Sequence, residues 1–334
     1  MNGECNLKEK AFLKYLLKNK VPQEQADVYI SRLNEFSYFL KKENNNIDSF
    51  PNGEIIKYAN ILVESNSNLV LDFLKALINY ANFIKNYDYI VEIIDISESY
   101  NAMDNLYQRI AEQHGEQIRD EIFKNIKIPP LGTHPEKKPE FTKVVLRRLV
   151  EKIGEEKTIE LLKPCLHGRP GDIKKDREDF LRINDIDEFL KLKKQELIER
   201  LQTHQKEGTL EFAQYIDDEV IEFIKNTPSI SPGIREGNKI ITSKMPYQTK
   251  KHIQAKDKKM KGFYSCYCPW IRGAIKNGTN EELFSHFCYC SAGYTKKYWD
   301  IIFDQPAIVE PIETPLTGGL LCTFTVNIPK EFQK

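Results

Sequence analysis

The sequence predicts a mostly α-helical protein with a C-terminal α+β domain, in which a small antiparallel sheet carries a cysteine cluster. Two observations lead to this fold class. Apolar side chains recur every three or four residues in the earlier part of the chain, as in residues 22–42 and 68–86, and this spacing is typical of amphipathic helices. After residue 263 the apolar residues form short runs, as in 307–313 and 320–327, and such runs bounded by turn residues indicate strands.

The first part of the chain predicts a bundle of about four helices. Turn-forming residues, such as Asn44-Asn45-Asn46 and Pro51-Asn52-Gly53, separate them. Pro-rich residues 129–139 predict a linker before the helices resume. The expected helices cover residues 7–19, 22–42, 53–65, 68–86, 100–126, 140–153, 155–163, 177–204 and 209–226.

Three domains are expected from this pattern: a helical bundle at 1–95, a helical middle region at 96–226 and a cysteine-rich α+β ligand-binding domain at 227–334. The last domain should contain strands at 263–268, 307–313 and 320–327 and a short helix at 294–303.

The composition restricts the class of protein. Lys and Arg total 49, as do Asp and Glu, so the 334-residue chain has no overall basic excess for nucleic acid. We expect neither a signal peptide nor a membrane-spanning segment, because no apolar run is long enough. A cytoplasmic protein is therefore expected, with cysteines that serve as thiols or metal ligands rather than disulfides.

Cysteines cluster near the C-terminus, where Cys266-x-Cys268 and Cys288-x-Cys290 form two pairs. Residues two apart in a strand face the same side, so each pair can direct two thiols to one point. Four thiolates suit zinc or an iron–sulfur cluster. Cys165 and His167 repeat the same spacing and are possible additional ligands.

Two other uses of these cysteines remain open. Cys290 or Cys322 can act as the nucleophile of a thiol-dependent enzyme, with His286 as the base. The cysteines can also be buried structural residues of a non-catalytic scaffold. Binding of a small ligand is a further expectation, with Trp270, Glu310 and Glu313 as candidate ligand-binding residues.

The segment from Arg235 to Lys261 holds nine basic residues against two acidic ones. Such a segment can bind the phosphates of DNA, and the alternative is a solvated flexible linker. The candidate anion- or nucleic-acid-binding residues are Lys250, Lys251, Lys256, Lys258 and Lys259.

The stretches KYLLKNKVPQEQADVYISRLNEFSYFL and NLVLDFLKALINYANFIKN lie within residues 7–86. The spacing of their aromatic and apolar residues resembles that of the SAM-like core-binding domain of phage-integrase (tyrosine recombinase) proteins. This resemblance implies a helical bundle that clasps DNA.

Residues 263–329 contain Cys266-x-Cys268-Pro269-Trp270, Cys288-x-Cys290-x-x-Gly293 and Gly318-Gly319-x-x-Cys322-x-Phe324. This region is similar to 4-vinyl-reductase-type and L-2-amino-thiazoline-4-carboxylic acid hydrolase-like domains. The resemblance implies an α+β fold that binds small hydrophobic ligands or metals, or performs thiol chemistry. The whole chain resembles bacterial proteins of unknown function.

The sequence thus predicts a cytoplasmic sensor or binding protein rather than an enzyme. The cysteine cluster would bind a metal or a small ligand, and the N-terminal bundle would engage a partner or DNA.

Overall fold

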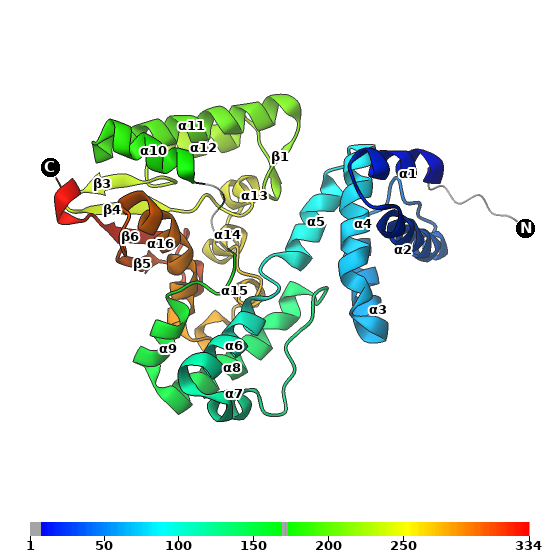
Figure 1. Ribbon diagram of the computed structural model, residues 1–334, viewed down its shortest axis with the longest axis horizontal. Helices are drawn as coiled ribbons and strands as arrows, with labels where there is room; N and C mark the ends of the chain where they lie inside the picture. Colours follow the sequence, from blue (N-terminus) through cyan, green and yellow to red (C-terminus); the bar gives the residue numbers. More distant parts are fainter. Residues whose placement is uncertain (1–7, 169–170, 172, 334) are drawn as a thin grey trace, which may run out of the picture. The chain divides into compact units, whose positions relative to one another are not determined.

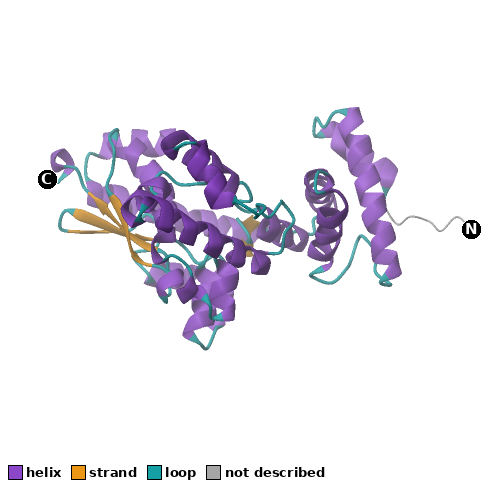
Figure 2. Cartoon of the chain, turned by 90° about the horizontal axis from the view of Figure 1, so that it is seen from below, coloured by secondary structure: helices purple, strands orange, loops and turns teal. Residues whose placement is uncertain are grey.

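The computed structural model describes residues 8–168, 171 and 173–333. Helices dominate, and two small antiparallel sheets lie in the C-terminal part, which confirms the predicted fold class (Figure 1). The chain forms two compact units. Unit 1 comprises Met1–Tyr100 and Pro129–His134, and unit 2 comprises Asn101–Ile128 and Pro135–Lys334. The strands belong to unit 2, where Figure 2 shows them in orange.

Unit 1 is a helical bundle. Its first four helices match the predicted ones, and a fifth, α5, was not expected from the sequence because its Ile and Tyr residues have modest helix propensity. The five helices are α1 (Glu9–Lys18), α2 (Gln23–Lys42), α3 (Glu54–Asn66), α4 (Leu69–Ile84) and α5 (Asp88–Ser97).

Aromatic packing holds unit 1 together. The buried Phe36 ring has its centroid 5.3 Å from that of Phe50, 5.2 Å from that of Tyr58 and 5.1 Å from that of Phe73. The Glu92 carboxylate on α5 accepts backbone hydrogen bonds from Gly53 and Ile56, and so satisfies free N–H groups at the start of α3. The predicted linker joins this packing, because Leu131 contacts the same core.

Two of the long helices predicted for unit 2 are each divided into two shorter ones. The single helix expected at 100–126 is two helices, because Gly115 between them has a φ of +89°. The helix expected at 177–204 is also two, because Asn184 has a left-handed φ of +52° and Asp185 caps the next helix. The helices are α6 (Ala102–His114), α7 (Glu116–Phe123), α8 (Lys138–Ile153), α9 (Glu155–Leu162), α10 (Lys174–Ile183) and α11 (Ile186–Glu207).

Two further expectations are corrected. Residues 209–226 begin with the small hairpin of β1 (Leu210–Glu211) and β2 (Gln214–Tyr215), and helix α12 (Asp218–Asn226) follows. The strand expected at 263–268 is wrong, because residues up to Ser265 belong to helix α14 (Lys258–Ser265). The Asp257 side chain caps this helix by accepting a hydrogen bond from Met260 N, and the cap outweighs the β propensity of the aromatic residues.

A four-stranded antiparallel sheet lies in unit 2, in the order β3-β4-β6-β5. The predicted hairpin between the last two strands is present, and β4 pairs with β6. On one face Ile240, Phe324 and Val326 are buried against Phe189 of α11 and Trp299 of α16 (Tyr289–Phe303). The strands are β3 (Ile234–Glu236), β4 (Lys239–Ser243), β5 (Val309–Glu313) and β6 (Thr323–Asn327).

The remaining helices of unit 2 connect these strands: α13 (Thr249–Gln254), α15 (Arg272–Asn277) and α16 (Tyr289–Phe303). The regions 96–226 and 227–334 share this unit, except for residues 96–100 and 129–134, which belong to unit 1. No helix in the described part of the chain is both long and apolar enough to cross a membrane.

Candidate functional site

The loop after α9 carries Cys165 and His167, and helix α6 holds it in place. The Arg109 guanidinium on α6 donates hydrogen bonds to the carbonyl oxygens of Leu161, at 2.6 Å, and of Cys165, at 2.9 Å. The Asn105 amide donates to Leu166 O at 2.6 Å. These bonds hold Cys165 in a left-handed conformation, with a φ of +41°, that a non-glycine residue rarely adopts.

Helix α16 packs closely against this loop at Gly293. A Cβ atom on Gly293 would lie 2.0 Å from Lys163 O and 2.5 Å from Cys165 N, so a larger residue cannot fit without a shift of the backbone. Cys290 precedes Gly293 by one helical turn and therefore lies on the same face of α16. Its Sγ accepts a hydrogen bond from Leu166 N at 3.2 Å.

The result is a compact group of three metal-ligating side chains. Cys165 Sγ, Cys290 Sγ and a ring nitrogen of His167 all lie within 4.8 Å of one another. The distance from Cys165 Sγ to His167 Nδ1 is 3.5 Å. Tetrahedral zinc with ordinary Zn–S and Zn–N bonds separates a sulfur and a nitrogen ligand by about 3.6 Å. The spacing of these atoms therefore fits a shared metal ion.

The two sulfur atoms differ in their electrostatics. The hydrogen bond from the Cys290 thiol lowers the pKa of Cys165, although burial opposes the effect, and His167 lowers it further. The pKa of Cys290 is raised well above its ordinary value, first by the same hydrogen bond and then by burial. In the absence of a metal, Cys165 is thus the more acidic thiol of the pair, and both side chains are almost fully buried.

The four cysteines of the two Cys-x-Cys pairs do not join in one such group among the described residues. Cys266 and Cys268 lie in the loop after α14, Cys288 ends a 3-10 helix (Ser285–Cys288), and Cys290 lies in the first turn of α16. None of the four lies in a strand. Residues two apart in a helix point about 200° apart, so the helical backbone does not direct Cys288 and Cys290 to one point.

The remaining thiols resemble core residues. Burial raises the pKa of Cys266 and of Cys288, and raises the pKa of Cys322 to about 12. Cys266 and Cys288 pack with Trp270 in an apolar cluster, and Cys322 packs with the sheet. These three side chains are therefore neutral thiols near pH 7.

The predicted base His286 contacts Glu155 rather than a cysteine. Its Nδ1 lies 3.0 Å from the Glu155 carboxylate, and its ring packs near Tyr289. The histidine that contacts Cys165 is His167. Cys165 and His167 were predicted only as additional ligands, because they lie more than a hundred residues before Cys290 and only the packing of α16 joins them.

The candidate ligand-binding residues have structural contacts. Trp270 is fully buried beneath the Lys138 ammonium, 5.0 Å from the ring centroid. Glu313 accepts hydrogen bonds from Leu320 N and Thr323 Oγ1 and so stabilises the β5–β6 hairpin. Hydrogen bonding to Glu310, together with burial, raises the pKa of Tyr289 to about 12.

The basic segment 235–261 is folded, so the alternative of a flexible linker is wrong. It contains β3, β4, α13 and the start of α14. Lys250 pairs with Asp217, and the Lys251 ammonium lies 5.9 Å from the centroid of the Tyr264 ring. Lys256, Lys258 and Lys259 are exposed, and DNA binding by these five lysines stays a prediction.

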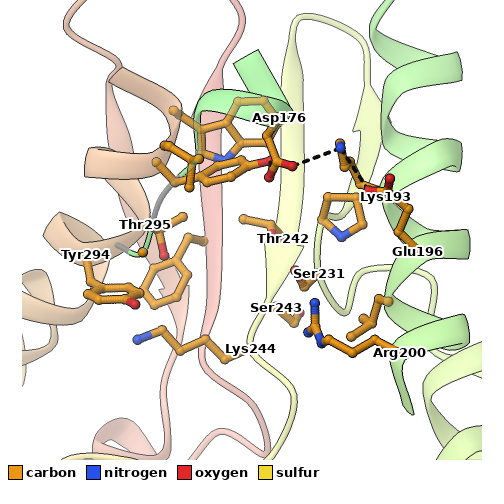
Figure 3. A pocket seen from close by; sticks show the side chains of 17 residues that line it. Asp176, Lys193, Glu196, Arg200, Ser231, Thr242, Ser243, Lys244, Tyr294 and Thr295 are labelled. Atoms are coloured by element: carbon orange, nitrogen blue, oxygen red, sulfur yellow. Dashed lines mark hydrogen bonds and ion pairs between the residues drawn. The ribbon is translucent and has the colours of Figure 1, made fainter. Parts of the chain in front are cut away.

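A cavity of about 530 Å³ lies near the three-ligand group, although none of the three ligands lines it, and no sequence pattern predicted it. It lies between α11, α16 and the sheet (Figure 3). Tyr294 lines the cavity, and its ring centroid lies 5.9 Å from that of His167. Its lining comes from several separate segments, so no local motif could have revealed it.

Comparison of the chain with protein-family models, with curated proteins and with solved structures finds no match.

Proposed function

We propose that this protein is a cytoplasmic metal-binding protein, and that Cys165, His167 and Cys290 hold a zinc ion. The observation that carries the proposal is the convergence of three ligand atoms from two distant segments within 4.8 Å. Two thiolates and an imidazole are the donors that zinc prefers. The free thiols in the described part of the chain agree with a reducing compartment.

Three protein ligands leave the fourth tetrahedral position of zinc open. In zinc proteins this position holds water, a substrate or another small ligand, whereas purely structural sites use four protein ligands. The half-buried His167 lies on the side of Tyr294 and the cavity. This arrangement supports the role of a sensor or binding protein. It favours zinc over an iron–sulfur cluster, which commonly uses four cysteine ligands.

The test is elemental analysis of anaerobically purified protein, followed by zinc titration of the apo form. We expect about one zinc per chain. Cys165→Ser, His167→Ala and Cys290→Ser should each remove tight binding. Cys288→Ser is the matched control, because Cys288 is also buried and lies close to Cys290 in the sequence.

Two outcomes would contradict the proposal. One is a folded wild-type protein that takes up no zinc, cobalt or cadmium. The other is metal that survives Cys165→Ser and Cys290→Ser but is lost from Cys266→Ser and Cys268→Ser, which would return the site to the two Cys-x-Cys pairs.

A thiol-dependent enzyme is the second candidate, and the 3.5 Å contact between Cys165 and His167 favours it. A catalytic nucleophile must reach its substrate, yet Cys165 is only 2% exposed. Rapid, selective alkylation of Cys165 by iodoacetamide in the metal-free protein would support this candidate. Uniformly slow alkylation would leave metal binding as the function of the pair.

A further inference from the structure

The cavity beside the three-ligand group has one aromatic side and one charged side. Helix α16 contributes Tyr294, Tyr298 and Trp299, and β6 contributes Phe324. Helix α11 contributes Lys193, Glu196 and Arg200 from the opposite side (Figure 3). A volume of about 530 Å³ is within the range of sites that hold small organic ligands.

Two of the three cations in this lining are already neutralised. The Lys193 ammonium lies 2.8 Å from carboxylate oxygens of Asp176, Asp179 and Glu196. The Arg200 guanidinium donates two hydrogen bonds to Glu211, at 3.0 and 3.1 Å. The acidic trio could hold a cation by its spacing alone, but the Lys193 ammonium already occupies its centre.

Lys244 is the third cation, and it has no carboxylate partner among the described residues. Its ammonium donates a hydrogen bond to Ser291 Oγ at 2.8 Å. It otherwise faces rings, 5.0 Å from the centroid of Tyr294 and 5.7 Å from that of Tyr267. The nearby thiols of Cys266 and Cys322 do not compensate its charge, because burial keeps both protonated.

A half-buried ammonium surrounded by rings and hydroxyls has lost part of its hydration shell. It is therefore stabilised when an anion takes the place of the missing water. The aromatic wall beside it offers stacking area for a planar body. The carboxylates of Asp176 and Glu196 also line the cavity, where they pair with Lys193, so no further free cation is offered to a second negative charge on the ligand among the described residues. The shape and the charge pattern together select an aromatic ligand with one negative charge.

We infer that this cavity binds an aromatic carboxylate, with Lys244 as the counter-ion of its carboxylate and Tyr294 as the wall on which its ring packs. The site goes beyond the proposed metal function and does not depend on it. Its occupant needs no metal ligand, because Lys244 supplies the charge.

The experiment is isothermal titration of the full-length protein with naphthoate, with its neutral isostere naphthamide, and with naphthyl phosphate. Each is measured on chelator-treated and on zinc-loaded protein, so that a failure of metal binding leaves this test unaffected. We expect naphthoate to bind at least about tenfold more tightly than either of the other two compounds.

Substitutions test whether Lys244 binds the carboxylate of the ligand. Lys244→Met should weaken naphthoate binding about tenfold or more and leave the weak binding of naphthamide unchanged, whereas Lys244→Arg should keep most of the affinity. Lys239→Met is the matched control, because Lys239 lies at the start of β4, the strand that Lys244 follows, but is exposed. Thermal melting confirms that each variant is folded.

Three results would overturn the inference. They are equal affinity for naphthoate and naphthamide, tighter binding of naphthyl phosphate, or unchanged naphthoate binding in folded Lys244→Met. No detectable binding of naphthoate at millimolar concentration would also count against it.

Discussion

The rings of His167 and Tyr294 lie with their centroids 5.9 Å apart, and this pair joins the three-ligand group to the cavity. His167 belongs to the loop after α9, whereas Tyr294 belongs to α16 and lines the cavity. The proposed metal and the proposed carboxylate would thus share one aromatic neighbour. Any change in the Tyr294 ring should therefore alter ligand affinity at both sites.

Tyr294→Ala should therefore affect both ligands. We expect naphthoate affinity to fall about tenfold, because the ring supplies a packing wall, and zinc affinity to fall by a smaller factor, because His167 loses a neighbour that orients it. Titration calorimetry with each ligand measures both effects. Tyr264→Ala, outside the cavity lining, is the control; a Tyr294 variant with unchanged affinity for both ligands would contradict the shared role.

Zinc should protect Cys165 from alkylation. A thiolate bound to a metal is a poor nucleophile, so added zinc should slow the modification of Cys165, the more acidic thiol of the pair, by iodoacetamide. Cys268, which is partly exposed and lies outside the group, should react at the same rate with and without zinc. Mass spectrometry of peptides measures each rate. Protection of Cys266 and Cys268 instead would place the metal elsewhere.

Arg109 should tune metal affinity without being a ligand. It holds the carbonyl oxygens of Leu161 and Cys165, so Arg109→Met should loosen the loop and lower zinc affinity about tenfold. A chelator competition assay measures the change.

Arg148→Met is the matched control for Arg109, because Arg148 likewise donates to two carbonyl oxygens, those of Ile122 and Lys124. It should lower stability while zinc affinity stays near that of the wild type. Equal losses of zinc affinity in the two variants would show that the effect is one of general stability.

Gly293→Ala should destabilise unit 2. The new Cβ would lie 2.0 Å from Lys163 O, so α16 or the loop must move, at a cost of about 3 kcal/mol in the free energy of unfolding. Zinc binding should weaken as well, because Cys290 moves with α16. Gly168→Ala is the control, since Gly168 lies in the loop against which α16 packs, yet a Cβ atom there would meet no atom of the described residues within 4 Å. Urea titration compares the two; similar stability would refute the close-packing argument.

Lys138→Met should stabilise the protein near pH 7. The Lys138 ammonium is fully buried and has no hydrogen-bond partner among the described residues, and burial lowers its pKa from 10.5 to about 8. A shift of this size corresponds to roughly 3 kcal/mol of destabilisation when the side chain is charged. Methionine fills a similar volume without a charge.

The stability difference between the wild type and Lys138→Met should depend on pH. Below pH 8 the amine is protonated in both the folded and unfolded states, so the wild type carries the whole penalty. As the pH rises from about 8 to 10.5, the folded state loses the proton first, so the stability of the wild type increases towards that of Lys138→Met. Urea titrations across this range measure the difference. A constant difference would contradict the assignment, and exposed Lys157→Met should show little effect.

The helices predicted at 22–42 and 68–86 are confirmed as α2 and α4, because a continuous apolar stripe needs no information from distant residues. The single helices predicted at 100–126 and 177–204 are wrong, because Gly115 and Asn184 adopt positive φ values inside an otherwise periodic pattern. The strand predicted at 263–268 is wrong as well, because its aromatic residues favour a strand in isolation, whereas the Asp257 cap starts a helix that extends to Ser265.

The sequence by itself determined the helical class of the chain, the final hairpin and the chemical character of the cysteine-rich end, since these depend on local spacing and composition. The tertiary structure determined which thiols meet. Cys165 and His167 reach Cys290 only because Gly293 lets α16 approach the loop that Arg109 holds. The environment of the Lys244 ammonium is likewise visible only in three dimensions, because a cation's partners depend on which distant side chains the fold brings within a few ångströms.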